Sequence, residues 1–279
     1  MNKRRSHVNL FKAKTPEGFK IKMLAELLQN NIKTACFEIS ESGIKLRMIN
    51  SHRIILIDLE LSADNFTIYK FRSENKITIG INLNHFHKML KSIKKKDNII
   101  LFIRNDNPTE LGIKVIPKEN NRKTISYIKI QNVQNISIEL PKEYNKPIIV
   151  PSIDYQKTCK DMNSIGGIIN VVSNGYYVKF LCNTGNVLKR EVIFGEIGDD
   201  DDSDYEDDDQ EEYSQKFDTE QFCRIVKMAG LGSVMHVFPK GGNPILFRSN
   251  IGTLGNISIY IKSREQIELE ENNEGEYSD

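Results

Sequence analysis

Two periods of apolar and polar residues run along this chain, and they separate its helices from its strands. The helical period is clearest in Asn82–Asp97, where residues placed at intervals of about 100° form one apolar stripe and one polar stripe. The apolar stripe consists of Leu83, Phe86, Leu90 and Ile93, and the polar stripe consists of Asn84, Lys88, Lys91 and Lys95. The pattern predicts an amphipathic helix over Asn82–Asp97 that buries one face and exposes a basic one.

The same combination of an apolar face and a basic face occurs in three more stretches. Helical periodicity covers Gly18–Lys33, Ile153–Ile165 and Asp218–Ala229. Ser152 is placed to cap the second of these helices, while Asp218 and Gln221 have the spacing of a capping box at the start of the third. One such helix is usually no more than a solvated surface helix, but four with basic faces indicate a common role.

Between the helices the period is two, which is typical of half-buried strands. Two hairpins with a glycine at the turn, Ala35–Ile49 around Gly43 and Ile169–Cys182 around Gly175, lie 132 residues apart. Further strands are predicted from Phe11, where Phe11 and Ala13 alternate with lysines, and at Ile54–Leu61, Phe66–Phe71, Lys76–Ile81, Ile99–Arg104, Glu110–Ile116, Thr124–Gln131, Asn186–Phe194, Ser233–Phe238, Pro244–Ser249 and Asn256–Ile261. The order of helix, strands, helix and strands thus occurs twice. It predicts a duplicated α+β fold in which helices pack across sheets.

The stretch Asn132–Lys146 interrupts this rhythm and is interpreted as a connector between two domains. It is extended, with one proline at Pro141 and no glycine. The predicted limits are a basic extension at 1–10, a first domain at 11–131, the connector at 132–146, a second domain at 147–262 that includes an acidic loop at 198–214, and an acidic tail at 263–279.

The net charge of +1 conceals a strong separation of charge along the chain. The acidic run Asp199–Glu212 holds eleven acids, and the tail Glu265–Asp279 holds seven, with no Lys or Arg in either segment. The rest of the chain therefore carries a net charge of +19, which favours a polyanionic partner. The acidic run itself is expected to be a solvated loop without fixed structure.

Candidate catalytic and metal-binding patterns are weak. The four cysteines are widely spaced and form no zinc pattern, and His85 and His87 diverge on a helix, so no metal site and no cofactor are expected. The acidic run leaves open a metal-dependent nuclease, although its carboxylates lie in one low-complexity stretch and no phosphate-binding glycine loop accompanies them. No apolar stretch has the length of a membrane span, and the N-terminus has no apolar signal-peptide core, so an intracellular protein is expected.

Several of these stretches resemble the sliding clamps of the proliferating cell nuclear antigen (PCNA) family. The similarity is collinear from Phe11 to about Ile261. It is carried by FKAK…MLAELLQNNIKTACFEISESGIKL at the first helix and hairpin, INLNHFHKMLK at the second helix and PSIDYQKTCKDMNSIG at the third. The resemblance implies a DNA-clamp fold of two similar domains, each with about two helices and eight to nine strands, assembled as a homotrimeric ring around double-stranded DNA.

The resemblance also implies roles for individual residues. The lysines expected to face DNA, without reading its sequence, are Lys22, Lys88, Lys91, Lys157, Lys160 and Lys227. The residues expected to line a pocket for client peptides beside the connector are Ile49, Ile54, Leu140, Tyr144 and Pro244. The strand Glu110–Ile116, with Leu111, Ile113 and Val115, is expected to pair with Asn186–Phe194 of a neighbouring subunit, with Val187, Lys189 and Val192.

The partners implied by the resemblance are DNA polymerase, the clamp loader and other proteins that carry PCNA-interacting peptides. A processivity factor without enzymatic activity is the leading hypothesis, and one subunit of a heterotrimeric checkpoint-type clamp is the alternative. Localisation is left between the nucleus and a cytoplasmic viral replication site. Where the family has Ala-Pro-Lys after its last strand, this chain has Lys262, Ser263 and Arg264, so the rim of the client pocket differs from the family pattern.

Overall fold

The computed structural model describes residues 8–119, 122–134, 136–185, 187–196 and 213–276. The chain divides into two compact units: unit 1 comprises residues 1–48, 57–138 and 250–257, and unit 2 comprises residues 49–56, 139–249 and 258–279. The strands β4 (Ile55–Ser62), β16 (Ile245–Ile251) and β17 (Gly255–Ile261) contribute residues to both units. Each unit is thus assembled from several stretches, whereas the limits predicted from the sequence are continuous, and those limits remain predictions.

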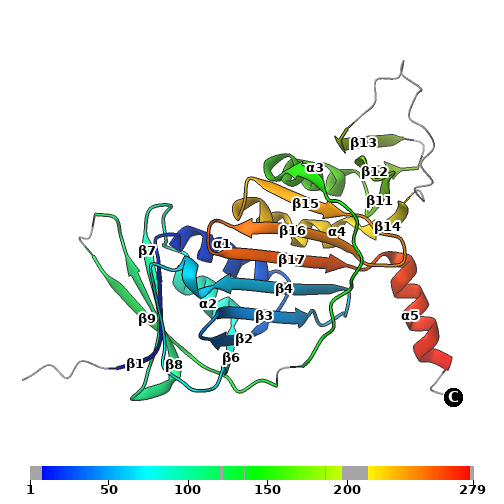
Figure 1. Cartoon of the computed structure of the whole chain (residues 1–279). Coiled ribbons are helices and arrows are strands. Elements are labelled where there is room, and N and C mark those ends of the chain that lie inside the picture. The colour runs from blue at the N-terminus through cyan, green and yellow to red at the C-terminus, as the bar shows by residue number, and fades with distance from the viewer. Residues whose placement is uncertain (1–7, 120–121, 135, 186, 197–212, 277–279) are drawn as a thin grey trace, which may run out of the picture. The chain divides into compact units, whose positions relative to one another are not determined.

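Unit 1 contains a five-stranded antiparallel sheet and a second group of three strands (Figure 1). The five strands lie in the order β5 (Ile68–Phe71), β1 (Asn9–Thr15), β7 (Asn98–Arg104), β8 (Asn107–Ile116) and β9 (Thr124–Lys129). The other group is β6 (Ile77–Asn82), β2 (Thr34–Ser40) and β3 (Gly43–Ile49), and a short 3-10 turn at Ala63–Asn65 follows β4. Gly43 has a φ of 145°, and a Cβ there would lie 2.0 Å from the Leu61 carbonyl oxygen, which explains the glycine at this turn.

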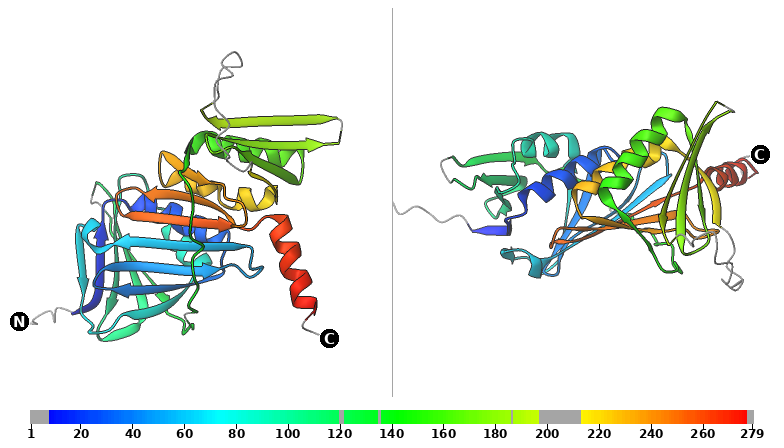
Figure 2. Two further views of the ribbon diagram at one scale, coloured as in Figure 1. Left: turned by 45° about the vertical axis from the view of Figure 1, so that its right-hand side comes forward. Right: turned by 90° about the horizontal axis from the view of Figure 1, so that it is seen from above.

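The two helices of unit 1 are α1 (Gly18–Gln29) and α2 (Leu83–Leu90), which contact each other. Figure 2 shows α1, in dark blue, beside the cyan α2. The predicted apolar faces are buried in both helices: Ile21, Leu24, Leu27 and Leu28 on α1, and Leu83, Phe86 and Leu90 on α2. Burying each of these side chains stabilises the unit by roughly 1.5–3 kcal/mol before the entropic cost of ordering it.

Unit 2 contains a four-stranded antiparallel sheet in the order β13 (Leu188–Gly195), β12 (Tyr177–Thr184), β11 (Ile168–Ser173) and β14 (Tyr213–Asp218). A second group joins β10 (Ile148–Pro151) and β15 (Val234–Phe238) to β16. Its helices are α3 (Ser152–Ile165), α4 (Thr219–Arg224) with a 3-10 turn at Val226–Gly230, and α5 (Arg264–Glu276). Buried aromatic rings of Tyr155, Phe180, Phe222 and Phe247 contact one another in its core.

Three local predictions about helix ends are corrected by the structure. Pro151, and not Ser152, is the N-cap of α3, and the buried Ser152 hydroxyl has no hydrogen-bond partner in the described part of the chain. Asp218 is the N-cap of α4, but its carboxylate accepts from the Gln221 side-chain amide at 3.4 Å and caps no backbone N–H. The predicted helix Asn82–Asp97 ends at Leu90.

Two strands and one helix were not expected from the sequence. β10 and β14 are short, and β14 leads directly into α4, so its period-two signal is masked by the helical signal that follows. The acidic tail contains the helix α5, which Figure 1 shows in red, extending away from the end of β17.

Candidate functional site

The predicted DNA-facing lysines of unit 1 divide into two kinds. Lys88 and Lys91 are exposed at the end of α2, and neither side chain forms an ion pair with a described residue. Lys22 on α1 instead donates hydrogen bonds to the carbonyl oxygens of Lys91 at 2.8 Å and Ile93 at 3.3 Å, and it lies over the Phe19 ring. Lys22 therefore neutralises the carbonyl end of α2 and joins the two helices.

The early end of α2 follows from competition for its backbone groups. The N–H of Ile93 bonds to the Leu90 carbonyl three residues back, and the N–H of Lys94 donates to the Asp97 carboxylate at 2.9 Å. The Lys94 N–H and the Lys91 carbonyl, which a continuing helix would use, are thus bonded to side chains. The chain therefore leaves the helix after Leu90 and turns. Lys94, Lys95 and Lys96 are exposed there, outside the helix to which the sequence assigned Lys95.

The predicted DNA-facing lysines of unit 2 lie on a helix whose aspartates form ion pairs, or in the turn after α4. On α3, Lys157 and Lys160 are exposed, and Lys157 pairs with Asp154 at 3.4 Å. Asp161, on the same helix, pairs with Arg190 of β13 at 2.6 Å. Lys227, the last predicted lysine, is half-buried in the 3-10 turn after α4.

A strand edge is available in each unit, and in unit 1 it is not the predicted one. β8 is hydrogen bonded to β7 on one side and to β9 on the other, so it has no free edge. Leu111, Ile113 and Val115 are buried at 5%, 1% and 6% exposure within the unit. The expectation that Glu110–Ile116 pairs with a neighbouring subunit is therefore wrong for an intact unit 1, because β9 already occupies that position.

In these two sheets the outer strands with exposed apolar side chains are β9, at the end of the five-stranded sheet opposite β5, and β13, at the end of the four-stranded sheet opposite β14. They are called here the free edges of unit 1 and unit 2. β9 exposes Ile125 and Tyr127, and β13 exposes Leu188 and Ile193, with Val187 exposed just before it. β13 also contains the predicted interface residues Lys189, which pairs with Glu191, and Val192, which is half-buried. Exposed apolar side chains along an unpaired edge are the features of a strand that pairs with another chain.

An aromatic cluster lies beside the second half of the connector in unit 2. Phe238, Leu246 and Tyr260 form its buried floor, and Leu56, Leu140 and Tyr144 pack against them while staying partly accessible. The Tyr144 ring lies 6.1 Å from that of Phe238 and 6.0 Å from that of Tyr260. Burial, with a smaller effect from Tyr260, raises the pKa of the Tyr144 phenol, so this hydroxyl acts as a hydrogen-bond donor.

The structure brings three of the five predicted pocket residues together. Leu140 and Tyr144 belong to the cluster, and the Tyr144 hydroxyl donates to the Pro244 carbonyl at 2.7 Å. Ile49 and Ile54 are half-buried in the same unit but are not members of the cluster. The sequence prediction missed Leu56, Phe238, Leu246 and Tyr260. Leu56 had a usable signal, because it is an apolar residue on the outward register of a strand whose inward residues, Ile55 and Ile57, are buried.

The connector is fixed in place at both ends of its course. In unit 1, Gln131 and Gly80 exchange backbone hydrogen bonds of 2.8 and 3.0 Å. In unit 2, the Asn243 side chain donates to the Lys142 carbonyl at 2.9 Å, next to Glu143, which has a φ of 67°. A left-handed conformation at a non-glycine residue is costly, and here the bonds on either side of Glu143 hold it and orient Tyr144.

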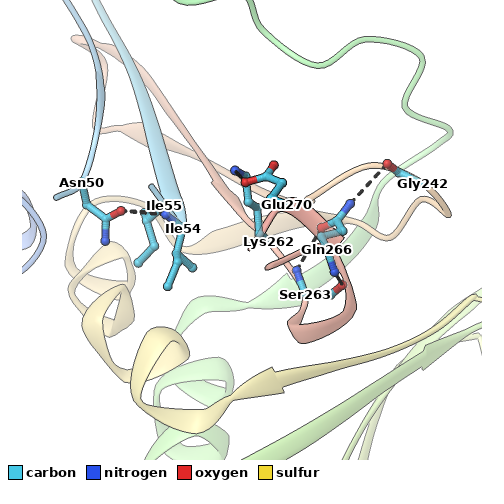
Figure 3. A network of polar contacts seen from close by, with 8 residues as sticks. All are labelled: Asn50, Ile54, Ile55, Gly242, Lys262, Ser263, Gln266 and Glu270. Carbon is cyan, nitrogen blue, oxygen red and sulfur yellow. Dashed lines mark hydrogen bonds and ion pairs between the residues drawn. The ribbon is translucent and has the colours of Figure 1, made fainter. Parts of the chain in front are cut away.

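The helix α5 follows β17 and starts with a reciprocal capping box (Figure 3). The Gln266 N–H donates to the Ser263 hydroxyl at 3.2 Å, and the Ser263 N–H donates to the Gln266 side-chain oxygen at 2.9 Å. The Gln266 amide nitrogen also donates to the Gly242 carbonyl at 3.2 Å, and Lys262 pairs with Glu270 at 2.5 Å. The departure from the family pattern at Lys262–Arg264 thus starts a helix.

The residues present do not form a metal centre or a reactive thiol in the described part of the chain. No group of three or more His, Cys, Asp or Glu side chains is arranged there to hold a metal ion. All four cysteines are free, and burial raises the pKa of each thiol, to about 12 for Cys159. The acidic run, on which the nuclease alternative depends, lies outside the described residues.

Among the described helices, none has both the length and the apolar character needed to cross a membrane.

Comparisons with known proteins match both units. The N-terminal domain model of proliferating cell nuclear antigen matches residues 10–140, and its C-terminal domain model matches residues 139–264. A curated relative, described as probable DNA polymerase sliding clamp 1 of Paramecium bursaria Chlorella virus 1, is 24% identical over 258 residues, which cover 90% of this chain and 96% of the relative.

Two similar α+β units with lysine-bearing helices, matched end to end by clamp domains, define a DNA sliding clamp, a DNA-binding processivity factor of replication. The chain belongs to the proliferating cell nuclear antigen family.

Proposed function

We propose that copies of this chain assemble head to tail into a closed homotrimeric ring around double-stranded DNA. The ring tethers a DNA polymerase and other replication or repair proteins, and a clamp loader places it on DNA. The observation that carries the proposal is the pair of free edges, β9 in unit 1 and β13 in unit 2. Two different edges on one chain allow a repeated heterologous contact, which closes into a ring when the rotation between copies is 120°.

The lysines supply attraction without sequence recognition. Lys88, Lys157 and Lys160 are exposed on helices, Lys91 is exposed just after α2, and each carries a point charge. Contacts of this kind with phosphates are individually weak and exchangeable, and they weaken as salt rises. Such contacts suit a protein that moves along DNA, because base contacts would fix it at one sequence.

The aromatic cluster is the proposed site for client proteins. Leu56, Leu140 and Tyr144 are partly exposed over a buried apolar floor, so an apolar or aromatic anchor of a peptide can pack there and exclude water. The chain then acts as a binding platform and not as an enzyme, which agrees with the non-catalytic role of its family.

The test is mass measurement by light scattering after gel filtration, with an edge variant. Wild type should elute as a trimer at micromolar concentration, and Ile125→Asp/Tyr127→Asp should elute as a monomer because it places two charges along β9. Leu269→Asp changes an exposed apolar residue on α5 and is the matched control, which should remain trimeric. A wild-type monomer would contradict the proposal, and a ring that forms only with a second clamp chain would favour the heterotrimeric alternative.

A further inference from the structure

Unit 1 contains a concave basic surface that the proposed DNA and client contacts do not use. It is a pocket of about 690 Å³, called here the basic notch. Its lining consists of Ser92, Lys94, Lys95, Lys96, Asp97, Pro117, Lys118, Glu119 and Arg122. Five cations thus surround a pocket that contains only two carboxylates, so it attracts a group of negative charges and not a single one.

The positive charge of the notch is not neutralised within the unit. None of the five cationic side chains forms an ion pair with a residue in the described part of the chain. Asp97 is buried at 6% exposure, and its carboxylate is engaged by the Lys94 backbone N–H at 2.9 Å. The notch is therefore open to an external acidic segment.

The notch lies next to the free edge of unit 1. Its residues Pro117, Lys118, Glu119 and Arg122 belong to the connection that leaves the end of β8 and leads into Thr124, the first residue of β9. A chain that pairs with β9 must place one end of its own strand beside this connection.

The acidic run begins beside the free edge of unit 2. β13 ends at Gly195 and β14 starts at Tyr213, so residues 196–212 join them. The registers place Gly195 opposite Tyr177 and Tyr213 opposite Ser173, so both attachment points lie at the same end of the four-stranded sheet. Three strand spacings separate them by about 14 Å, whereas the joining chain can span about 56 Å when extended. The joining chain is thus about four times as long as the gap it spans.

The direction of pairing brings these two features together. Strand pairs within the five-stranded and four-stranded sheets are antiparallel. If β9 of one copy also pairs antiparallel with β13 of the next, the start of β9 faces the end of β13. The notch of one copy then lies beside the point from which the acidic run of the next copy departs.

We propose that the acidic run Asp199–Glu212 of one copy binds the basic notch of the neighbouring copy and strengthens the contact between them. The inference rests on the head-to-tail ring proposed above. It gives a role to the most extreme sequence feature of the chain, whose eleven carboxylates match the excess of cations in the notch. The interaction between the run and the notch is electrostatic and its charges are solvent-exposed, so it is strongest at low ionic strength.

The experiment compares dissociation of full-length rings at several salt concentrations by sedimentation velocity. The notch variant is Lys94→Glu/Lys96→Glu/Lys118→Glu, and the run variant replaces three acids, Asp207→Lys/Asp208→Lys/Asp209→Lys. Each should raise the concentration at which half of the rings dissociate by about tenfold at low salt, and the difference should vanish at about 1 M salt. Glu268→Lys/Glu271→Lys on α5 is the control and should leave the value unchanged.

Combining the two sets of reversals in one chain should restore most of the lost stability, since the charges again oppose each other. Carbodiimide cross-linking of mixed heavy-isotope and light-isotope copies should also join notch lysines to run carboxylates as mixed pairs. Cross-links found only within one chain would overturn the proposal. Unchanged salt dependence of ring dissociation in both variants would overturn it as well. If the notch variant loses only affinity for DNA, the notch binds DNA phosphates and not the acidic run. Wild type that forms no oligomer at any salt would contradict the ring itself, which is a separate result.

Discussion

The two units differ in how they use charge on their helices. From α2 through Asp97, unit 1 carries five lysines and one aspartate, and the lysines of this stretch form no ion pair with a described residue. On α3, unit 2 carries two lysines and two aspartates, and both aspartates form ion pairs. Unit 2 instead contains the aromatic cluster and the second half of the connector. In the proposed ring, unit 1 would therefore contribute more of the attraction to DNA, and unit 2 would contribute the client site.

The largest effect is expected at the aromatic cluster. Leu140→Ala/Tyr144→Ala should weaken binding of a client peptide with two aromatic anchors at least thirtyfold, because central aromatic contacts contribute about 2 kcal/mol or more. DNA retention should not change, which would separate the roles of the two units. Fluorescence anisotropy with a labelled peptide measures the effect. Leu269→Ala serves as the control, and equal binding by the double variant would place the client site elsewhere.

A smaller effect is expected for the lysines of unit 1. Lys88→Ala/Lys91→Ala should lower the affinity for linear duplex at low salt about tenfold and reduce the salt slope by about two, because two phosphate contacts are lost. Lys157→Ala/Lys160→Ala should change the slope by less than one, since Lys157 is already paired with Asp154. Titrations at several salt concentrations provide the slopes. Equal losses in the two variants would remove the distinction between the units.

The carboxylates of α3 provide the converse test. Asp154→Asn/Asp161→Asn should raise DNA affinity about threefold, because Lys157 and Arg190 lose their partners and α3 gains two units of net charge. The same titration measures it, with Glu268→Gln/Glu271→Gln on α5 as a control of equal charge change. If affinity stays constant, α3 does not contact DNA.

The smallest effect concerns Lys22, whose structural role can be separated from DNA binding. Lys22→Met should lower the free energy of unfolding by about 1 kcal/mol, because the carbonyls of Lys91 and Ile93 lose a charged donor. Lys22→Arg should retain most of that stability. Urea unfolding of both variants measures the difference, and an unchanged midpoint for Lys22→Met would show that these hydrogen bonds contribute nothing measurable.

Much of the fold was predictable because burial follows simple periods. The apolar stripes of α1 and α2 are the buried faces, and the alternating residues of β4 are buried as the period of two requires. The glycines at Gly43 and Gly175 mark turns in the structure because both have positive φ. These features depend on residues close together in sequence.

The failures have tertiary causes. The length of α2 was overestimated because two side chains bind backbone groups just after it. Lys22, which is distant in sequence, binds the Lys91 carbonyl, and Asp97 accepts from the Lys94 N–H. The resemblance placed the edge of unit 1 at β8. Since both β8 and β9 alternate, the sequence pattern could not correct this, and only the sheet order shows which strand is last. The floor of the cluster, Phe238, Leu246 and Tyr260, comes from three separate strands, so no local pattern connects them. The capping box at Ser263 and Gln266, by contrast, has a local signal: its spacing would have predicted the start of α5.

Retention on circular and linear DNA tests the central claim most directly, because a closed ring is held by topology and not by affinity. The protein would be loaded by its clamp loader onto a nicked plasmid and washed at about 0.5 M salt, where phosphate contacts are weak. A closed ring should stay on the circle and be released within minutes when one restriction cut makes the plasmid linear. Loss from the circle at the same rate as from the linear DNA would contradict it.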